Sequence, residues 1–125
     1  MSKHNEVGKI GEELAKKFLE KQGYKIIEQN YKTKYAEIDL VVSLPVRADK
    51  PKSLIFIEVR TKIGESFGSP EETINKKKMR KLLGNASSYA AIKKWEGPYR
   101  IDAICIVLKP DYSIIRLNHY ENIIN

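Results

Sequence analysis

In this 125-residue sequence, two acidic residues lie on neighbouring predicted strands at positions where their carboxyl groups could meet. Asp39 lies in the stretch EIDLVV (37–42), and Glu58 lies in LIFIEVRTK (54–62). If the two strands form a hairpin whose turn is centred between residues 48 and 49, Asp39 falls opposite Glu58. Directly opposed side chains are roughly 5 Å apart at Cβ, and like charges at that distance are destabilising. A hard divalent cation such as Mg²⁺ would remove this repulsion.

Basic side chains accompany the second acid. Side chains alternate between the two faces of a strand, so Arg60 and Lys62 share the face of Glu58, and Glu37 shares the face of Asp39. The apolar residues that we expect on one common face of the first strand are Ala36, Ile38, Leu40 and Val42. These residues alone leave two interpretations open: a metal site, or a solvent-facing strand edge with ordinary surface ion pairs.

A cluster of five cations follows within six positions of one predicted helix: Lys76, Lys77, Lys78, Arg80 and Lys81. Together with the net charge of +7 and a pI near 9.4, the cluster indicates a nucleic acid partner, DNA ahead of RNA. The alternative is a helix face that is simply solvated. Lys78 interrupts the apolar stripe of Ile74, Leu82 and Ala86. Its ammonium group either extends to water or reaches the charged end of the central strands.

Hydrophobic periodicity and turn residues predict the elements that position these side chains. We expect helices over 7–22 and 70–95, and strands over 24–31, 37–42, 54–62, 99–108 and 113–117. Ser69 and Pro70 are typical of a helix start, and Gly84 with Asn85 would kink or split the second helix. The order α-β-β-β-α-β-β predicts a single α/β domain over 1–125, with a mixed central sheet flanked by helices. Residues 44–53 are expected to form an exposed, irregular loop.

Other classes of protein and site are excluded by composition. No apolar run has the eighteen or so residues of a membrane span, and the N-terminus lacks the apolar region of a signal peptide, so we expect a cytoplasmic protein without a membrane partner. The single cysteine, Cys105, lies in an apolar run and is expected to be buried and inert. Asp102 is the exception in that apolar strand, and Arg100 or a loop is its expected partner.

Six motifs in order resemble one known family. They are G-x-x-G-E (Gly8, Gly11, Glu12), E-I-D-L (37–40), F-I-E-V-R (56–60), F-G-x-P (Phe67, Gly68, Pro70), a lysine in the second helix (Lys78) and R-I-D (100–102). This pattern looks like the YraN family, which is assigned to the restriction-endonuclease-like, PD-(D/E)XK, nuclease superfamily and is similar to archaeal Holliday-junction resolvases. The resemblance extends from Gly8 to about Val107, which is nearly the whole chain.

The resemblance implies a restriction-endonuclease-like core and metal-dependent cleavage of phosphodiesters, with Mg²⁺ or Mn²⁺ as cofactor. It implies that Asp39 and Glu58 are metal ligands, and that Glu12, rather than Glu13, is an additional ligand or positioning acid. Glu37 is a weaker candidate. Position 60 carries the signature basic residue, where this sequence has arginine instead of the superfamily's lysine. Arginine cannot act as a general base, and Lys62 would then supply the missing ammonium group.

The expected activity is that of a structure-selective endonuclease acting on branched or repair intermediates of DNA, with Arg60 or Lys62 stabilising the developing charge. The five cations of the second helix would hold the backbone without reading bases. Two alternatives stay open: a catalytically inactive nucleic-acid-binding module, and a basic helix that docks an acidic protein. A homodimer is also left open.

Overall fold

The computed structural model describes residues 3–34, 36–44 and 52–124. Their helical elements are α1 (Lys3–Lys21), the short 3₁₀ helix η1 (Pro70–Thr73) and α2 (Lys76–Ile92). The strands are β1 (Lys25–Lys32), β2 (Glu37–Leu44), β3 (Ser53–Ile63), β4 (Tyr99–Leu108) and β5 (Ile114–Tyr120). The predicted α/β order is confirmed, and each predicted strand is found to within three residues at either end.

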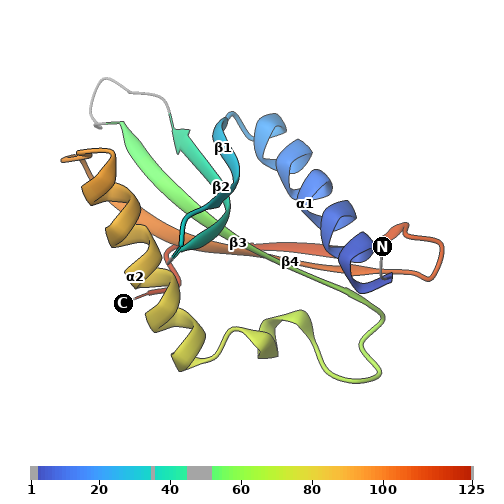
Figure 1. Ribbon diagram of the computed structural model, residues 1–125. Coiled ribbons are helices and arrows are strands. Elements are labelled where there is room, and N and C mark those ends of the chain that lie inside the picture. The colour runs from blue at the N-terminus through green and yellow to red at the C-terminus, as the bar shows by residue number, and fades with distance from the viewer. Residues whose placement is uncertain (1–2, 35, 45–51, 125) are drawn as a thin grey trace.

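The strands form one mixed sheet in the order β1-β2-β3-β4-β5. The first three strands make an antiparallel meander, β3 and β4 run parallel, and β5 returns antiparallel to β4. A parallel pair needs a long crossover connection, which is supplied here by η1 and α2. Figure 1 shows the two helices on opposite sides of the sheet.

Two apolar clusters fill the space between the sheet and its helices. Ala15 and Leu19 of α1 pack against one face, whose members include Ile55, Ile57 and Ile104. Leu82, Ala86 and Tyr89 of α2 pack against the other face, whose members include Leu54, Phe56 and Ile101. β4 is buried along most of its length because helices cover both of its faces. Cys105 is buried there as expected, and burial raises the pKa of its thiol to about 12.

The predicted hairpin register is confirmed. Leu44 pairs with Ser53, and the ladder continues to the pair of Leu40 and Ile57, so the next residues on each strand are Asp39 and Glu58. One prediction about the faces of β2 is wrong. Ile38 packs with the cluster under α2, whereas Leu40 and Val42 pack with the cluster under α1. The ladder between β2 and β3 ends at Leu40, so that pairing no longer holds Ile38 to the strict alternation.

The second helix begins later than predicted. Ser69 does cap a helix start, because its Oγ accepts from Glu72 N at 3.3 Å, but that turn is only η1. Ile74 leaves helical geometry at φ −102° and ψ 81°. Asn75 then caps α2, its Oδ1 accepting from Lys78 N at 2.9 Å. The signal at Ser69 and Pro70 therefore marks a turn before the long helix.

Neither end of the expected range 70–95 belongs to α2, and the helix is continuous across Gly84 and Asn85. The expected split of the helix is therefore wrong. Instead Asn85 is buried, and its Nδ2 donates to Glu37 O at 3.2 Å, which fixes α2 to the start of β2. Most of the predicted loop over 44–53 lies outside the described residues. No helix of the described part of the chain is long and apolar enough to cross a membrane.

Candidate functional site

The acids predicted from the sequence meet in one cleft. The cleft has a volume of about 640 Å³ and lies between the first turns of α1, the facing ends of β2 and β3, and the first turns of α2. Its acidic lining residues are Glu12, Glu37, Asp39 and Glu58. Its basic lining residues are Lys9, Arg60, Lys62, Lys78 and Lys81. Three layers of the fold thus contribute charged groups to one space.

Asp39 and Glu58 form the centre of this cleft. Asp39 Oδ2 accepts a hydrogen bond from Val59 N at 2.9 Å, which fixes the carboxyl group against β3 just beyond the end of the strand ladder. Glu58 is buried, with 6% of its surface exposed. Burial, and next the nearby charge of Glu58, raise the pKa of Asp39 to about 7. Near neutral pH the Asp39 carboxyl group therefore still holds a proton, which a bound cation would replace.

Two cations already contact Glu58. Arg60 Nη2 lies 2.8 Å and Lys78 Nζ 3.2 Å from the same oxygen, Oε2. Of the two orientations open for Lys78, the structure therefore has the one in which the ammonium group reaches the charged end of the central strands. Arg60 Nε is shielded from solvent and has no hydrogen-bond partner in the described part of the chain. The cleft thus offers an uncommitted donor beside its acids.

A glycine brings α1 close enough to contribute Glu12. Gly11 faces Thr61 of β3, and a Cβ atom added at this glycine would overlap Thr61 Oγ1 and Cβ. The next residue, Glu12, lines the cleft, and burial followed by the charges of Glu37 and Glu58 raises its pKa. Glu13 is exposed and accepts from Gln29 Nε2 at 3.1 Å, away from the central pair. The structure therefore brings Glu12, and not Glu13, to the other acids.

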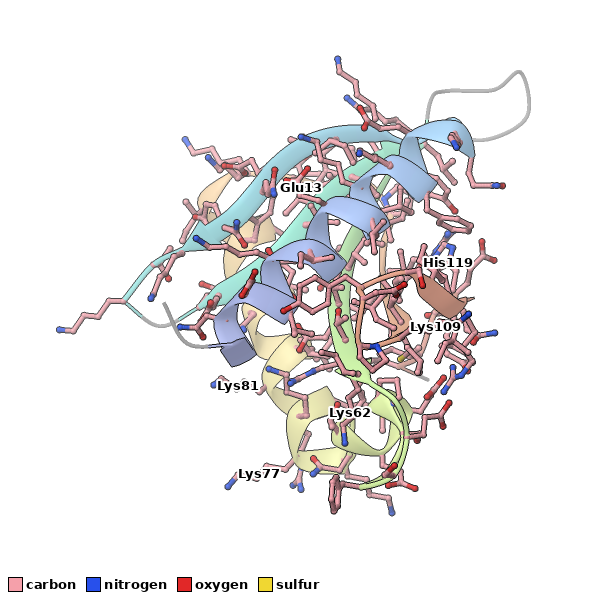
Figure 2. The ribbon with its side chains drawn as sticks, turned by 90° about the vertical axis from the view of Figure 1, so that its right-hand side faces the viewer. Glu13, Lys62, Lys77, Lys81, Lys109 and His119 are labelled. Atoms are coloured by element: carbon pink, nitrogen blue, oxygen red, sulfur yellow. The ribbon has the colours of Figure 1, made fainter. Side chains whose placement is uncertain are left out.

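The predicted basic cluster is divided between two surfaces. Lys78 and Lys81 line the cleft, whereas Lys76 and Arg80 line a shallow hollow together with apolar residues of α2 and the C-terminal segment. Lys77 is exposed. Figure 2 shows Lys62, Lys77 and Lys81 toward the same end of the molecule, with His119 well away from them in this view. Only part of the cluster therefore faces the acids.

Sequence reasoning assigned no part in the site to several residues that build it. The close approach at Gly11 and Thr61 joins segments far apart in sequence, and no local pattern reports it. Asn85 carried a usable signal, because a polar residue next to Leu82 and Ala86 on the buried stripe needs a hydrogen-bond partner. Thr73 and Lys9 complete the rim without any sequence signal that we can identify.

The acids do not form a preassembled three-ligand site. Within residues 3–34, 36–44 and 52–124, no group of three or more His, Cys, Asp or Glu side chains is arranged to hold a metal ion. The Asp39 and Glu58 pair nevertheless has the donor chemistry that Mg²⁺ or Mn²⁺ takes, which is one or two carboxylates with the remaining positions left to water and phosphate. The residues present therefore fit a hard divalent ion held by two carboxylates.

A second buried acid, Asp102, lies in β4 and belongs to a separate network. It is 0% exposed and accepts from Arg100 Nε at 3.0 Å and from Asn122 N at 2.8 Å. His119 Nε2 lies 2.8 Å from its other oxygen. Burial opposes ionisation of Asp102, but these hydrogen bonds outweigh it and lower the pKa. This network confirms the pairing predicted with Arg100 and fastens the C-terminal segment to β4.

Comparison with known proteins gives one consistent result. The model of the family described as "Uncharacterised protein family UPF0102" matches residues 11–106. A UPF0102 protein of Clostridium perfringens is 38% identical over 124 residues, covering 98% of this chain and 97% of the relative. A UPF0102 protein of Thermotoga petrophila is 39% identical over 115 residues, covering 92% and 94%. One of Flavobacterium johnsoniae is 40% identical over 89 residues, covering 71% and 68%.

Proposed function

This chain belongs to the uncharacterised protein family UPF0102, the YraN-like family that its motifs indicated, and we propose that it is a metal-dependent nuclease acting on DNA. One observation carries the proposal. Asp39 and Glu58 are brought together on adjacent strands, inside a cleft whose other charged groups are mostly basic. Two neighbouring carboxyl groups in a basic cleft match a site for a divalent cation and a polyanion.

Asp39 and Glu58 would hold Mg²⁺ or Mn²⁺, with Glu12 as the third acid facing the same space. When bound there, the ion would supply Lewis-acid polarisation of a phosphodiester and activation of water for its hydrolysis. The protein's own part is to keep the two acids fixed. The hydrogen bond from Val59 N orients Asp39, and the strand backbone of β3 orients Glu58.

The basic side chains would bind the phosphate and stabilise charge that develops on it. Arg60 lines the cleft, and a guanidinium group stays charged at any working pH and can hold a phosphate with two parallel hydrogen bonds. Lys62 lies two residues further on the same strand and also lines the cleft. Lys81 extends the positive surface along α2. These groups contact only the backbone of DNA, so they support structure-selective and not sequence-specific binding.

The resemblance to the PD-(D/E)XK superfamily supports the same assignment from a separate direction. Its motif places the acids at Asp39 and Glu58, which are the residues that the fold places side by side. Arginine replaces the motif's lysine at position 60. Because arginine is no general base, we assign Arg60 to charge stabilisation and Lys62 to the remaining ammonium function.

The test is incubation of the purified protein with labelled branched, single-stranded and duplex DNA in the presence of Mn²⁺. We expect cleavage that chelator abolishes, and that Glu58→Gln reduces by at least about a hundredfold because it removes a ligand. Glu13→Gln is the matched control, since it makes the same chemical change at an exposed acid. Intact DNA in every reaction, or cleavage unaffected by Glu58→Gln, would overturn the proposal.

A second candidate is a nucleic-acid-binding module on a nuclease fold without catalysis. The observation that favours it is the double ion pair of Glu58, whose charge Arg60 and Lys78 already balance. Such a module binds DNA in a salt-sensitive way, since its contacts are to phosphates. Binding that neither chelator nor Asp39→Asn alters, with no cleavage, would favour this candidate over the nuclease.

A further inference from the structure

Phe67 is the most exposed large hydrophobic residue of the described part of the chain, with 98% of its surface accessible. It lies in the loop between β3 and η1, which carries the F-G-x-P motif. Figure 1 shows this loop, in yellow-green, leaving the end of β3 and turning back toward η1. Because nearly all of its surface is in water, the ring is available for contact with a ligand.

The loop around Phe67 is firmly attached to the sheet. Arg116 of β5 binds Glu65 before the phenylalanine, with Nε to Oε1 at 3.0 Å, and binds Glu71 after it, with Nη1 to Oε2 at 2.7 Å. Hydrogen bonds from Arg116, against a smaller effect of burial, lower the pKa of Glu71 to about 2. Gly68 closes the turn at φ +106°, and its N–H donates to Glu65 O at 3.1 Å. The backbone that carries Phe67 is therefore anchored on both sides.

The same loop borders the acidic cleft. Lys62 lines the cleft, and its Nζ donates to Phe67 O at 3.5 Å. A cation of the proposed phosphate-binding surface thus contacts the backbone of the residue that presents the ring. Alternation of phosphate-binding cations with a projecting aromatic ring is the arrangement by which proteins hold unpaired nucleotides, the cations taking the backbone and the ring taking a base.

We propose that Phe67 stacks on an unpaired nucleobase at a branch point, so that the substrate class is DNA in which a duplex opens into single strands. This inference rests on the proposed function and specifies its substrate. Within an intact duplex each base is already stacked between its neighbours, so the ring gains a partner only where pairing is interrupted. The phosphates on either side lie against Lys62 and the basic lining of the cleft. Phe67 would thereby set the preference for forks over plain duplexes.

The experiment compares binding of a forked DNA and a blunt duplex of equal length, in EDTA so that no cleavage occurs. The fork carries 2-aminopurine at its first unpaired position, whose fluorescence falls on stacking. We expect wild-type protein to quench the probe and to prefer the fork. Phe67→Ala should weaken fork binding about tenfold and abolish quenching, with duplex binding changed by no more than about twofold, since stacking on one base is lost. Phe67→Trp should restore both.

Ile115→Ala is the control, because it truncates another exposed apolar side chain, 53% accessible, on β5. Equal fork binding by wild type and Phe67→Ala would overturn the inference and leave the ring to a protein partner. Equal weakening of fork and duplex would also overturn it. Loss of fork preference in Phe67→Ala with no cleavage by wild type in Mn²⁺ would sustain the inference and sink the nuclease. Metal-dependent cleavage by wild type, together with unchanged fork binding by Phe67→Ala, would support the nuclease and overturn the stacking inference.

Discussion

Asp39 and Asp102 are both acids on the inner strands of the sheet, but their surroundings are opposite. Asp102 receives hydrogen bonds from Arg100, His119 and the backbone of Asn122, which together lower its pKa against the effect of burial. Asp39 receives one backbone hydrogen bond and otherwise faces Glu58 and Glu12, and its pKa rises to about 7. The fold therefore surrounds Asp102 with hydrogen-bond donors, whereas it leaves Asp39 facing other acids.

This difference indicates that Asp102 stabilises the fold, whereas Asp39 belongs to a ligand-binding site in the same sheet. A buried carboxylate with a complete set of donors contributes to the stability of the folded chain, and removing it leaves those donors without a partner. A carboxyl group held against another carboxyl group lowers stability and is retained where a ligand supplies the missing charge. α1 spans both regions: Gly11 and Glu12 lie at the cleft, and Phe18 meets the ring of His119 with centroids 6.0 Å apart.

The largest effect on stability is expected from Asp102→Ala, which tests whether Asp102 stabilises the fold. It leaves Arg100 without its buried counter-charge and His119 without its hydrogen-bond partner, and we expect the free energy of unfolding to fall by about 3–5 kcal/mol. Urea denaturation followed by circular dichroism measures it. Glu96→Gln, at an exposed acid, should change stability by less than about 0.5 kcal/mol. A loss below about 1 kcal/mol in the Asp102 variant would remove the distinction between the two acids.

The next effect concerns the helix that joins the two regions. Gly11→Ala forces a methyl group into Thr61, so α1 must move away from β3, and we expect a loss of about 1–3 kcal/mol. Gly8→Ala is the matched control, because nothing lies within 4 Å of the added atom. There we expect a gain of about 0.5–1 kcal/mol from the better helix propensity of alanine. Thermal unfolding of both variants checks the prediction, and equal values would show that the contact at Thr61 does not position α1.

The smallest effect is expected at Asp39 and depends on pH. In the folded protein this carboxyl keeps its proton up to about pH 7, whereas in the unfolded chain it loses the proton near its ordinary pKa of 3.8. The folded state therefore binds more protons between these values, so the contribution of Asp39 to stability declines as the pH rises toward 7. Asp39→Asn removes the charge, and at pH 8 it should be about 1 kcal/mol more stable than wild type in EDTA.

Adding Mg²⁺ gives a second test of the pH dependence of Asp39. Ion binding to the ionised pair should raise the melting temperature of wild type more at pH 8 than at pH 6, because at pH 6 the ion must first displace a proton. Asp39→Asn should show little response at either pH. A wild-type protein whose stability does not vary with pH across this range would place Asp39 in the same class as Asp102.

The sequence carried the parts of the fold that depend on local periodicity and on chain geometry. Alternation along 54–62 separated the apolar face of β3 from Glu58 and Arg60, and the hairpin centre placed Asp39 next to Glu58 in the register that the structure shows. The position of Lys78 was also informative, because a lysine inside an apolar stripe must extend either to water or to a buried acid.

The parts that were missed depend on contacts between distant segments. Ser69 and Pro70 have the local signature of a helix start, but Ile74 adopts a non-helical conformation and α2 begins again at its Asn75 cap. Asn85 is compatible with a kink by composition alone, and only the position of β2 provides Glu37 O as its acceptor. Ile38 pairs with Tyr31 of β1 but lies beyond the last pair between β2 and β3, and it packs with the cluster under α2, which residue types do not encode.

The parallel pairing of β3 with β4 has a consequence for how the protein folds. The meander of β1, β2 and β3 is connected by short separations in sequence, so it can bring Asp39 beside Glu58 early. Pairing of β3 with β4 must wait for closure of the long crossover through η1 and α2. Lys78 lies on that crossover, in α2, and contacts Glu58 only once the crossover has closed. From this topology we expect the acidic pair to form before Lys78 reaches Glu58.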